Sequence, residues 1–231
     1  MENKTVPTIV RWLVILAMPF FLGLGTIRAI IAWDYPAFEY GRIAPDAYGF
    51  TPEKRLQLAR GTLDYLQRPE PAAEVIYMLT DLRLPGTDSP LYNAAEISHM
   101  IDVKVMADGM KTVAYISGAI VIAGLLILLV PKRSRHFGWR TLMLAGLATV
   151  IILAAIALII LIAWPIFFVQ FHELLFPPGT WTFAYTDSLI RLFPEQFWFD
   201  IGVTISTTTL ALGILVTVIG WVMSKRSQLM A

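Results

Sequence analysis

The 231-residue sequence contains no cysteine, three histidines and few charged residues. Without cysteine there are no disulfide bonds, thiolate metal ligands or cysteine nucleophiles, so any folded part outside the cytoplasm has to be held together by packing and by its attachment to the membrane. Charged residues make up 15% of the chain, against roughly 25% in a soluble domain. The net charge is +1, and neither a Gly-rich phosphate loop nor a basic and aromatic patch is present. We therefore expect neither nucleic acid nor a nucleotide as a partner.

Apolar residues, 57% of the chain, are concentrated in four long runs. A membrane span needs about 20 apolar residues to cross a hydrocarbon core of about 30 Å. The first run is longer than the apolar part of a signal peptide, and no small-x-small cleavage site follows it, so we interpret it as a retained span. We predict an all-α membrane protein, a single membrane domain over 1–231, with four transmembrane helices at about 9–31, 113–130, 142–168 and 201–223.

The orientation of the spans is predicted by the basic residues in their short flanks, because lysine and arginine mark the cytoplasmic side. They occur before or at the very start of the first run, between the second and third, and after the fourth, as Lys4, Arg11, Lys132, Arg133, Arg135, Arg140, Lys225 and Arg226. We expect both termini in the cytoplasm and two extracytoplasmic segments, 32–111 and 169–200. Tryptophans near the membrane ends of these segments are typical of an aromatic belt, namely Trp33, Trp181 and Trp198.

The first extracytoplasmic segment is expected to be mostly helical. Thr51 followed by Pro52 is typical of a helix N-terminus. The next apolar residues recur at helical spacing and predict a face for packing, formed by Leu56, Ala59, Leu63 and Leu66. A second short helix is expected at about 72–79.

A longer helix, expected from Asn93 into the second span, carries acidic residues and a histidine on one face. At about 3.6 residues per turn, Glu96, His99 and Asp102 fall within one arc of its surface. Either carboxylate is placed to accept the imidazole N–H of His99, to fix the tautomer and to raise the basicity of the other ring nitrogen. The alternative interpretation is an exposed acidic helix face without chemistry.

His172 follows the third span directly, at the same predicted membrane depth at which His99 precedes the second. Glu173 is next, but the second histidine of an H-E-x-x-H zinc motif is missing because Phe176 stands in its place. A composite metal site from His99, His172 and Asp102 stays open, since two imidazoles and a carboxylate form a valid zinc or iron ligand set.

The remaining polar residues have structural interpretations. The third histidine, His136, lies in the basic connection between the second and third spans and is expected to be solvated. Asp187, Arg191 and Glu195 recur at helical spacing and are expected to form a structural ion pair.

Two of these segments resemble a known family. The residues from Glu96 to Lys104 read E-I-S-H-M-I-D-V-K, which resembles the E-x-x-H-M-x-D-V-K segment of the lipoprotein intramolecular transacylase (Lit) family. The second signature of that family is resembled by Phe171–Phe176, Trp181, Asp187 and Leu192-Phe193-Pro194. Order, spacing and topology are similar over nearly the whole chain.

The resemblance implies a four-span bacterial enzyme with its site on the outer face of the cytoplasmic membrane and with no cofactor. Such enzymes act on diacylated bacterial lipoproteins at the membrane. They move the sn-2 acyl chain of the diacylglyceryl group onto the α-amine of the lipoprotein's N-terminal cysteine, which gives the lyso-form. The two functional histidines of the family correspond to His99 and His172, and supporting residues are expected at Glu96, Asp102, Lys104, Glu173, Trp181 and Asp187.

We hypothesise that His99, oriented by Glu96 or Asp102, is the general base and later the acid, while His172 stabilises the oxyanion or shares the proton transfer. The two roles are interchangeable on the sequence. Lys104 offsets carboxylate charge, meets lipid head groups or has a neutral pairing role. Two other functions stay open: a non-catalytic lipid-binding accessory or sensor, and a metal-dependent lipid hydrolase that uses the two outer histidines.

Overall fold

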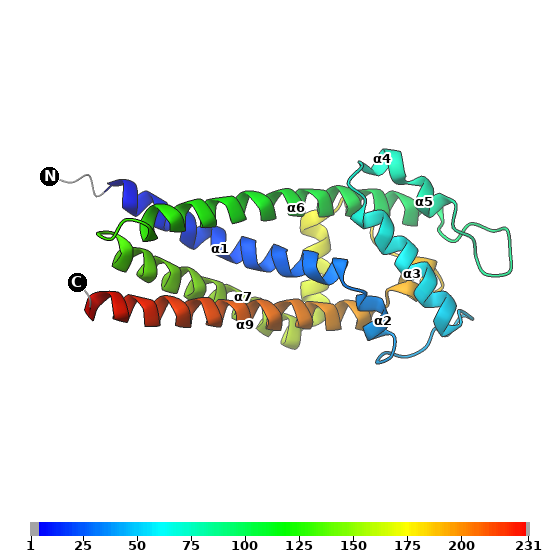
Figure 1. Cartoon of the computed structure of the whole chain (residues 1–231). Coiled ribbons are helices and arrows are strands. Elements are labelled where there is room, and N and C mark those ends of the chain that lie inside the picture. The colour runs from blue at the N-terminus through cyan, green and yellow to red at the C-terminus, as the bar shows by residue number, and fades with distance from the viewer. Residues whose placement is uncertain (1–4, 230–231) are drawn as a thin grey trace. The chain divides into compact units, whose positions relative to one another are not determined.

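The computed structural model describes residues 5–229, and these residues form nine helices and no strand. Four of the helices are apolar and long enough to cross a membrane (Figure 1), namely α1 (Thr5–Ala32), α6 (Ala94–Leu129), α7 (Arg135–Leu175) and α9 (Glu195–Leu229). They confirm the predicted all-α fold class with four transmembrane helices. The limits of the spans along these helices stay a prediction, and Lys4 of the N-terminal flank lies outside the described residues.

Five shorter helices connect the long ones, namely α2 (Tyr35–Glu39), α3 (Pro52–Gln67), α4 (Ala72–Val75), α5 (Tyr77–Thr80) and α8 (Ser188–Leu192). The short helix predicted at about 72–79 is thus two separate turns, α4 and α5, on either side of Ile76.

The chain divides into two compact units. Among the described residues, the first unit contains 5–28, 110–162 and 203–229. The second unit contains Ala29–Gly109 and Ala163–Gly202. Each of the four long helices contributes residues to both units.

Close helix contacts form the core of the first unit. Val14 of α1 packs in one buried cluster with Val121 of α6 and Ala145 of α7. Glycine permits the tightest approach, since a Cβ atom at Gly220 of α9 would lie 2.3 Å from the backbone nitrogen of Met143 in α7. Small residues at helix contacts are typical of membrane proteins, because lipid tails are as apolar as the side chains and close van der Waals packing has to hold the helices together.

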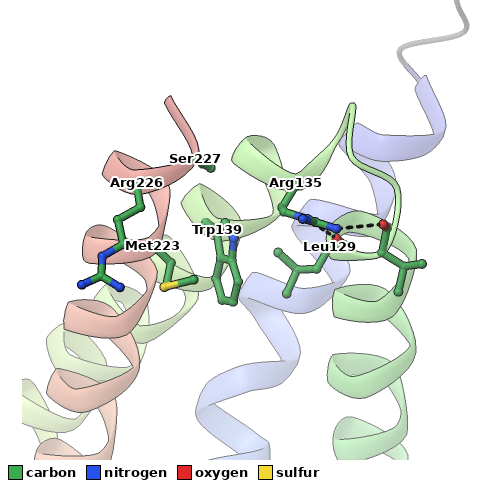
Figure 2. Close-up of a pocket in the computed structure, with 7 residues that line it drawn as sticks. Leu129, Arg135, Trp139, Met223, Arg226 and Ser227 are labelled. Carbon is green, nitrogen blue, oxygen red and sulfur yellow. Dashed lines mark hydrogen bonds between the residues drawn. The ribbon is translucent and has the colours of Figure 1, made fainter. Parts of the chain in front are cut away.

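The first unit also contains a cavity of about 440 Å³ where α6 and α9 end and α7 begins (Figure 2). Arg135 donates hydrogen bonds to the carbonyl oxygens of Leu129 (3.1 Å) and Val130 (3.4 Å), which are left without helical partners at the end of α6. No residue predicted for the functional site lines this cavity, whose walls are Leu129, Val130, Arg135, Trp139, Met223, Arg226 and Ser227.

His136, in the same unit, is not simply solvated as predicted. Its Nδ1 atom lies 3.0 Å from the carbonyl oxygen of Ser224 and 3.2 Å from the hydroxyl oxygen of Ser227. Packing of the start of α7 against the last turns of α9 brings a carbonyl oxygen within reach of the ring, and this oxygen replaces water as its partner.

Helix α7 is interrupted inside the predicted third span. Ala163 has φ −137° and ψ 43°, outside the helical region, and lies two residues before Pro165. Proline has no N–H to donate, its ring clashes with the preceding turn, and it restricts the residue before it. The expected continuous span over 142–168 is therefore broken at Ala163, which is also where α7 passes from the first unit to the second.

In the second unit, α3 begins as predicted: the hydroxyl oxygen of Thr51 accepts a hydrogen bond from the N–H of Lys54 at 3.3 Å, and Pro52 is the first helical residue. The buried face of α3 agrees with the predicted one only at Ala59. Leu56, Leu63 and Leu66 are only half-buried. The fully buried positions include two polar side chains and are Arg55, Leu58, Ala59, Thr62 and Tyr65.

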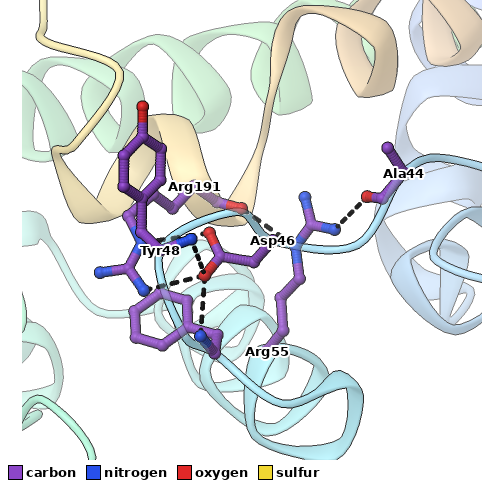
Figure 3. Close-up of polar contacts among 6 residues, drawn as sticks. Ala44, Asp46, Tyr48, Arg55 and Arg191 are labelled. Atoms are coloured by element: carbon purple, nitrogen blue, oxygen red, sulfur yellow. Dashed lines mark hydrogen bonds and ion pairs between the residues drawn. The ribbon is translucent and has the colours of Figure 1, made fainter.

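Arg55 is buried because it belongs to a polar cluster that joins α3 to α8 within the second unit (Figure 3). Its guanidinium donates to the carbonyl oxygens of Arg191 and Ala44, both at 3.0 Å. Arg191 in turn donates two hydrogen bonds to the carboxylate of Asp46, at 3.1 and 3.0 Å. This bidentate ion pair is nearly excluded from solvent, with side-chain exposures of 10% and 2%.

The ion pair expected among Asp187, Arg191 and Glu195 is therefore wrong. Arg191 pairs with Asp46, from a segment far away in the sequence. Glu195 accepts a hydrogen bond from the indole N–H of Trp164 at 3.0 Å. Helical spacing predicts which residues share a face, but the packing of α8 decides which carboxylate that face meets.

Candidate active site

The structure brings His99 and His172 together in the second unit. His99 lies in the early turns of α6 and His172 near the end of α7. The centroids of the two imidazole rings are 6.4 Å apart, and the ring planes are inclined by 26°. His99 is only 6% exposed, whereas His172 is half-buried.

Aromatic rings surround both imidazoles. Phe176 and Phe183 pack against His99, with centroid distances of 4.9 and 5.4 Å. Phe168 and Trp181 pack against His172, at 4.1 and 4.9 Å. Such an apolar environment disfavours an imidazolium ion and favours the neutral ring. We infer that both histidines are suited to exchange protons rather than to carry a permanent charge.

The tautomer of His172 follows from one hydrogen bond. Its Nδ1 atom lies 2.7 Å from the carbonyl oxygen of Phe168, one helical turn earlier. A carbonyl oxygen only accepts, so Nδ1 has to carry the proton and Nε2 has to carry the lone pair. Nε2 has no protein partner within the described residues, so this basic nitrogen is free to accept a proton.

His99 is not oriented by a carboxylate, contrary to the sequence hypothesis. Its Nδ1 atom is buried and has no hydrogen-bond partner within residues 5–229. The carboxylate of Glu96 is occupied elsewhere, because it accepts hydrogen bonds from the backbone N–H groups of Asn93 and Leu189, both at 2.7 Å. Asp102 is half-buried and forms no hydrogen bond or ion pair in the described part of the chain.

Glu96 instead has a structural role at the start of α6. Asn93 precedes α6, and its side-chain oxygen accepts from the N–H of Glu96 at 3.0 Å. With the return bond from Asn93 to the carboxylate, this is a capping box, which satisfies N–H groups that the first turn of a helix leaves free. The bond from Leu189 joins the same carboxylate to the first turn of α8. Glu96 thus fixes the start of α6, and with it the position of His99.

Lys104 is fully buried. Its ammonium group donates to the carbonyl oxygen of Arg68 at 2.8 Å and to the carboxylate of Asp108 at 3.1 Å. It also lies 5.9 Å from the centre of the Tyr65 ring. Of the roles left open for Lys104, the structure supports pairing, here with Asp108, and contradicts contact with lipid head groups, because no part of the side chain is exposed.

The supporting residues of the second segment have different positions. Glu173 is exposed and accepts a hydrogen bond from Gln170 at 2.8 Å, so it is not paired with either histidine. Asp187 accepts from the N–H of Ala184 at 2.8 Å and from the side chain of Asn93 at 3.4 Å. It therefore closes the loop that carries Trp181 and ties this loop to the start of α6.

Sequence reasoning missed Phe168 and Phe183. Phe168 carries a detectable signal, because it lies one helical turn before His172 and its carbonyl oxygen is the natural acceptor for that ring. Phe183 lies in the loop between α7 and α8, where no periodicity predicts a direction. The composite metal site receives no geometric support, since no three potential ligand side chains of His, Cys, Asp or Glu converge anywhere in residues 5–229.

Four long apolar helices and a pair of histidines whose pKa values are lowered by burial define a multi-pass membrane protein with a candidate acid–base site. The model of the family described as lipoprotein intramolecular transacylase Lit matches residues 11–198. The chain belongs to this family, as its two sequence segments predicted.

The chain is also similar to individual proteins. The chain is similar to the structure of the membrane-integral lipoprotein intramolecular transacylase Lit from Bacillus cereus, with a TM-score of 0.81 and 23% identity over 98% of this chain and 100% of that one. A variant of the Bacillus cereus protein in which one histidine is replaced by alanine gives a TM-score of 0.76 and 22% identity, over 98% of this chain and 97% of that one. At these identities the likeness shows a shared fold. An uncharacterized protein of Aquifex aeolicus is 26% identical over 215 residues, which is 92% of this chain and 93% of that protein.

Proposed function

We propose that the protein is a membrane acyltransferase that acts on diacylated bacterial lipoproteins. In this reaction the sn-2 acyl chain moves from the glycerol oxygen to the α-amine of the N-terminal cysteine, which leaves a lyso-form lipoprotein. The observation that carries the proposal is the paired arrangement of His99 and His172 among aromatic rings, in a chain that belongs to the lipoprotein transacylase family.

The residues suit the chemical demands of this reaction. Donor ester and acceptor amine belong to one molecule, so proximity already supplies much of the rate advantage. Three tasks are left for the protein: removal of a proton from the attacking amine, stabilisation of the tetrahedral oxyanion, and delivery of a proton to the departing glycerol oxygen.

The free lone pair on Nε2 supports His172 as the general base. It accepts a proton as the amine nitrogen forms a bond to the ester carbonyl carbon. The carbonyl electron pair moves onto oxygen and then returns, the carbon–oxygen bond to glycerol breaks, and the proton held by His172 passes to the glycerol oxygen. An N–H on the unpartnered Nδ1 of His99 is available to the oxyanion or to the departing oxygen. The sequence hypothesis had His99 as the general base and His172 at the oxyanion, so this assignment exchanges the two roles.

We further propose that both termini lie in the cytoplasm and that the histidines face the outer leaflet. The basic residues of the short flanks support this orientation, as does the chemistry of the substrate. At the outer face, the acyl chain of a lipoprotein stays in the bilayer while its ester is exchanged at the surface.

The test is mass spectrometry of the N-terminal peptide of a diacylated lipoprotein, co-expressed with this protein. We expect the cysteine to be N-acylated and the glycerol to keep one acyl chain. An unchanged diacylglyceryl peptide would contradict the proposal and favour a lipid-binding accessory or sensor. Loss of one acyl chain without N-acylation, sensitive to a chelator, would favour a metal-dependent lipid hydrolase.

A further inference from the structure

Trp181 carries a buried hydrogen-bond donor without an acceptor. The residue lies in the loop between α7 and α8, and its ring centroid is 4.9 Å from that of His172, with the planes inclined by 35°. The indole Nε1 atom is buried and has no partner within the described residues.

This arrangement is unusual for a tryptophan. The indole nitrogen donates only, and a buried N–H normally finds an acceptor. Trp164, in the same unit, does have an acceptor, since its N–H donates to the carboxylate of Glu195 at 3.0 Å in an exposed hydrogen bond. The N–H of Trp181 is thus a buried donor without an acceptor in the described part of the chain, on a ring that packs against the imidazole that we assign as the base.

We propose that the indole N–H of Trp181 donates a hydrogen bond to the carbonyl oxygen of the substrate ester and stabilises the oxyanion that forms there. The inference rests on the proposed acyl transfer. As the amine attacks the carbonyl carbon, the π electron pair moves to this oxygen, and the fixed N–H dipole meets the developing negative charge. The charge leaves when the carbonyl re-forms and the bond to the glycerol oxygen breaks. Trp181 itself gains and loses no proton.

Other nearby groups are less suited to the role. The carboxylates of Glu96, Glu173 and Asp187 accept hydrogen bonds and would repel an oxyanion. His172 is needed as the base. Among the described residues of the second unit, the other buried side-chain nitrogen without a partner is Nδ1 of His99. It can assist at the oxyanion only in the tautomer that protonates Nδ1, whereas an indole nitrogen is a donor at every pH of interest.

The experiment replaces the N–H and keeps the ring. Trp181→Phe retains an aromatic side chain against His172, and incorporation of the benzothiophene isostere of tryptophan at position 181 retains the bicyclic shape without the N–H. We measure turnover and KM of the purified full-length protein with a diacylated lipopeptide in lipid vesicles, using mass spectrometry. The matched control is Trp33→Phe, since Trp33 is half exposed and is not one of the aromatic residues that pack against His99 or His172.

We expect turnover to fall by about 10²–10³-fold in both variants at position 181, as for the loss of one oxyanion donor. KM should change by less than about threefold, because the hydrogen bond strengthens mainly in the transition state. Trp33→Phe should match the unsubstituted protein.

Turnover of the benzothiophene variant within about threefold of the unsubstituted protein would overturn the role of the N–H and leave the proposed function intact. Normal turnover with a strongly raised KM would also overturn it, because the ring would then serve ground-state binding. Absence of lyso-form product from the unsubstituted protein would overturn the proposed function and this inference together.

Discussion

The rings of His99 and His172 lie 6.4 Å apart and nearly parallel, but they differ in their hydrogen bonds. His172 donates from Nδ1 to its own helix, while Nδ1 of His99 is buried without a partner. No carboxylate of the described residues forms a hydrogen bond or ion pair with either ring. The proposed chemistry therefore depends on apolar burial and tautomer control rather than on a charge relay, and it should be sensitive to each imidazole separately.

We predict that His99→Ala and His172→Ala each lower lyso-form production by about 10²–10⁴-fold, the usual contribution of a positioned proton-transfer group. Both variants should stay folded, because neither ring belongs to the buried Asp46–Arg191 ion pair or to the capping box of Glu96. Turnover in vesicles and thermal unfolding in detergent check the two parts of this prediction. His136→Ala is the control, since His136 lies in the first unit, and it should retain full turnover. Full activity in both site variants would remove the two-histidine mechanism.

Lys104 and Asp108 should respond asymmetrically to substitution. The side chain of Lys104 is 0% exposed and that of Asp108 is 35% exposed. Asp108→Ala leaves a buried ammonium without its counter-ion, and we expect a loss of about 2 kcal/mol in the free energy of unfolding, reduced from the fully buried case by the exposure of Asp108. Lys104→Met fills the same space without charge, leaves a carboxylate that water reaches, and should cost less than about 1 kcal/mol.

Chemical denaturation of both variants in detergent measures this difference. Because Lys104 has no exposed surface, Lys104→Met should also keep the turnover of the unsubstituted protein per folded molecule. A larger loss of stability in Lys104→Met than in Asp108→Ala would contradict the prediction, and a selective loss of turnover would restore a direct role for Lys104.

The ion pair of Asp46 and Arg191 should make folding acid-sensitive. Burial by itself would raise the pKa of Asp46, but the hydrogen bonds from Arg191 and from the N–H of Phe50 outweigh it and lower the pKa overall. A carboxyl group with a lowered pKa in the folded state stabilises the fold above its unfolded pKa of about 4, and this contribution is lost as the pH falls through the folded value.

Asp46→Asn should therefore be less stable than the unsubstituted protein at pH 7, by about 3 kcal/mol, with a smaller difference below about pH 4. The control is Asp34→Asn. The pKa of Asp34 is also lowered, chiefly by its hydrogen bond from Arg60, but this pair is exposed on both sides and should contribute less than about 1 kcal/mol. Unfolding curves of Asp46→Asn, Asp34→Asn and the unsubstituted protein, recorded from about pH 3 to about pH 8, distinguish the buried ion pair from the exposed one. If the free energies of unfolding of Asp46→Asn and of the unsubstituted protein changed in parallel with pH, the ion pair of Asp46 and Arg191 would not be the cause of the acid sensitivity.

Gly220 should tolerate no side chain. A Cβ atom there would lie 2.3 Å from the backbone nitrogen of Met143, so α9 and α7 would have to separate. We expect Gly220→Ala to lower stability by about 1–3 kcal/mol, the typical result of overpacking. Gly23 of α1 is a matched control, because a Cβ atom there meets nothing within 4 Å. Gly23→Ala should be neutral or stabilising by up to about 1 kcal/mol. Equal melting temperatures for the two alanine variants would contradict the close approach of α7 and α9.

The orientation can be measured directly, because the chain contains no cysteine and any label reports an introduced one. Tyr185→Cys lies at an exposed position in the loop before α8, and Lys132→Cys lies in the basic connection between α6 and α7. A membrane-impermeant maleimide applied to intact bacterial spheroplasts should label position 185 and not position 132, with both labelled after lysis. The reverse pattern would place the histidines on the cytoplasmic side.

Several features were predictable because their causes are local in the chain. The four spans follow from uninterrupted apolar runs, since a bilayer core admits little else. The start of α3 at Thr51 follows from a capping hydroxyl before proline. The two family segments also predicted His99 and His172 as the functional histidines, and the structure places their ring centroids 6.4 Å apart. Their catalytic role stays a prediction.

Some expectations failed because several arrangements are compatible with the same local pattern. Pro165 was present in the third apolar run, but average hydrophobicity does not register the missing N–H that interrupts α7 at Ala163. The spacing of Glu96 and His99 predicts a shared helix face, yet the carboxylate turns to the free N–H groups of the first helical turn and of α8, because buried backbone donors left without acceptors are costly.

The sequence by itself determined the all-α membrane architecture and was enough to single out the two histidines as candidate site residues. The reason is that hydrophobic length, capping and residue type act within a few turns of chain. Only the tertiary structure decided the partners: Asp46 for Arg191, Asp108 for Lys104, Leu189 for Glu96. It also decided the tautomer of His172 and the free N–H of Trp181. Each of these features depends on which polar groups are buried next to one another when the helices pack. A buried polar group forms its hydrogen bond with a group that is near in space, which need not be near in the sequence.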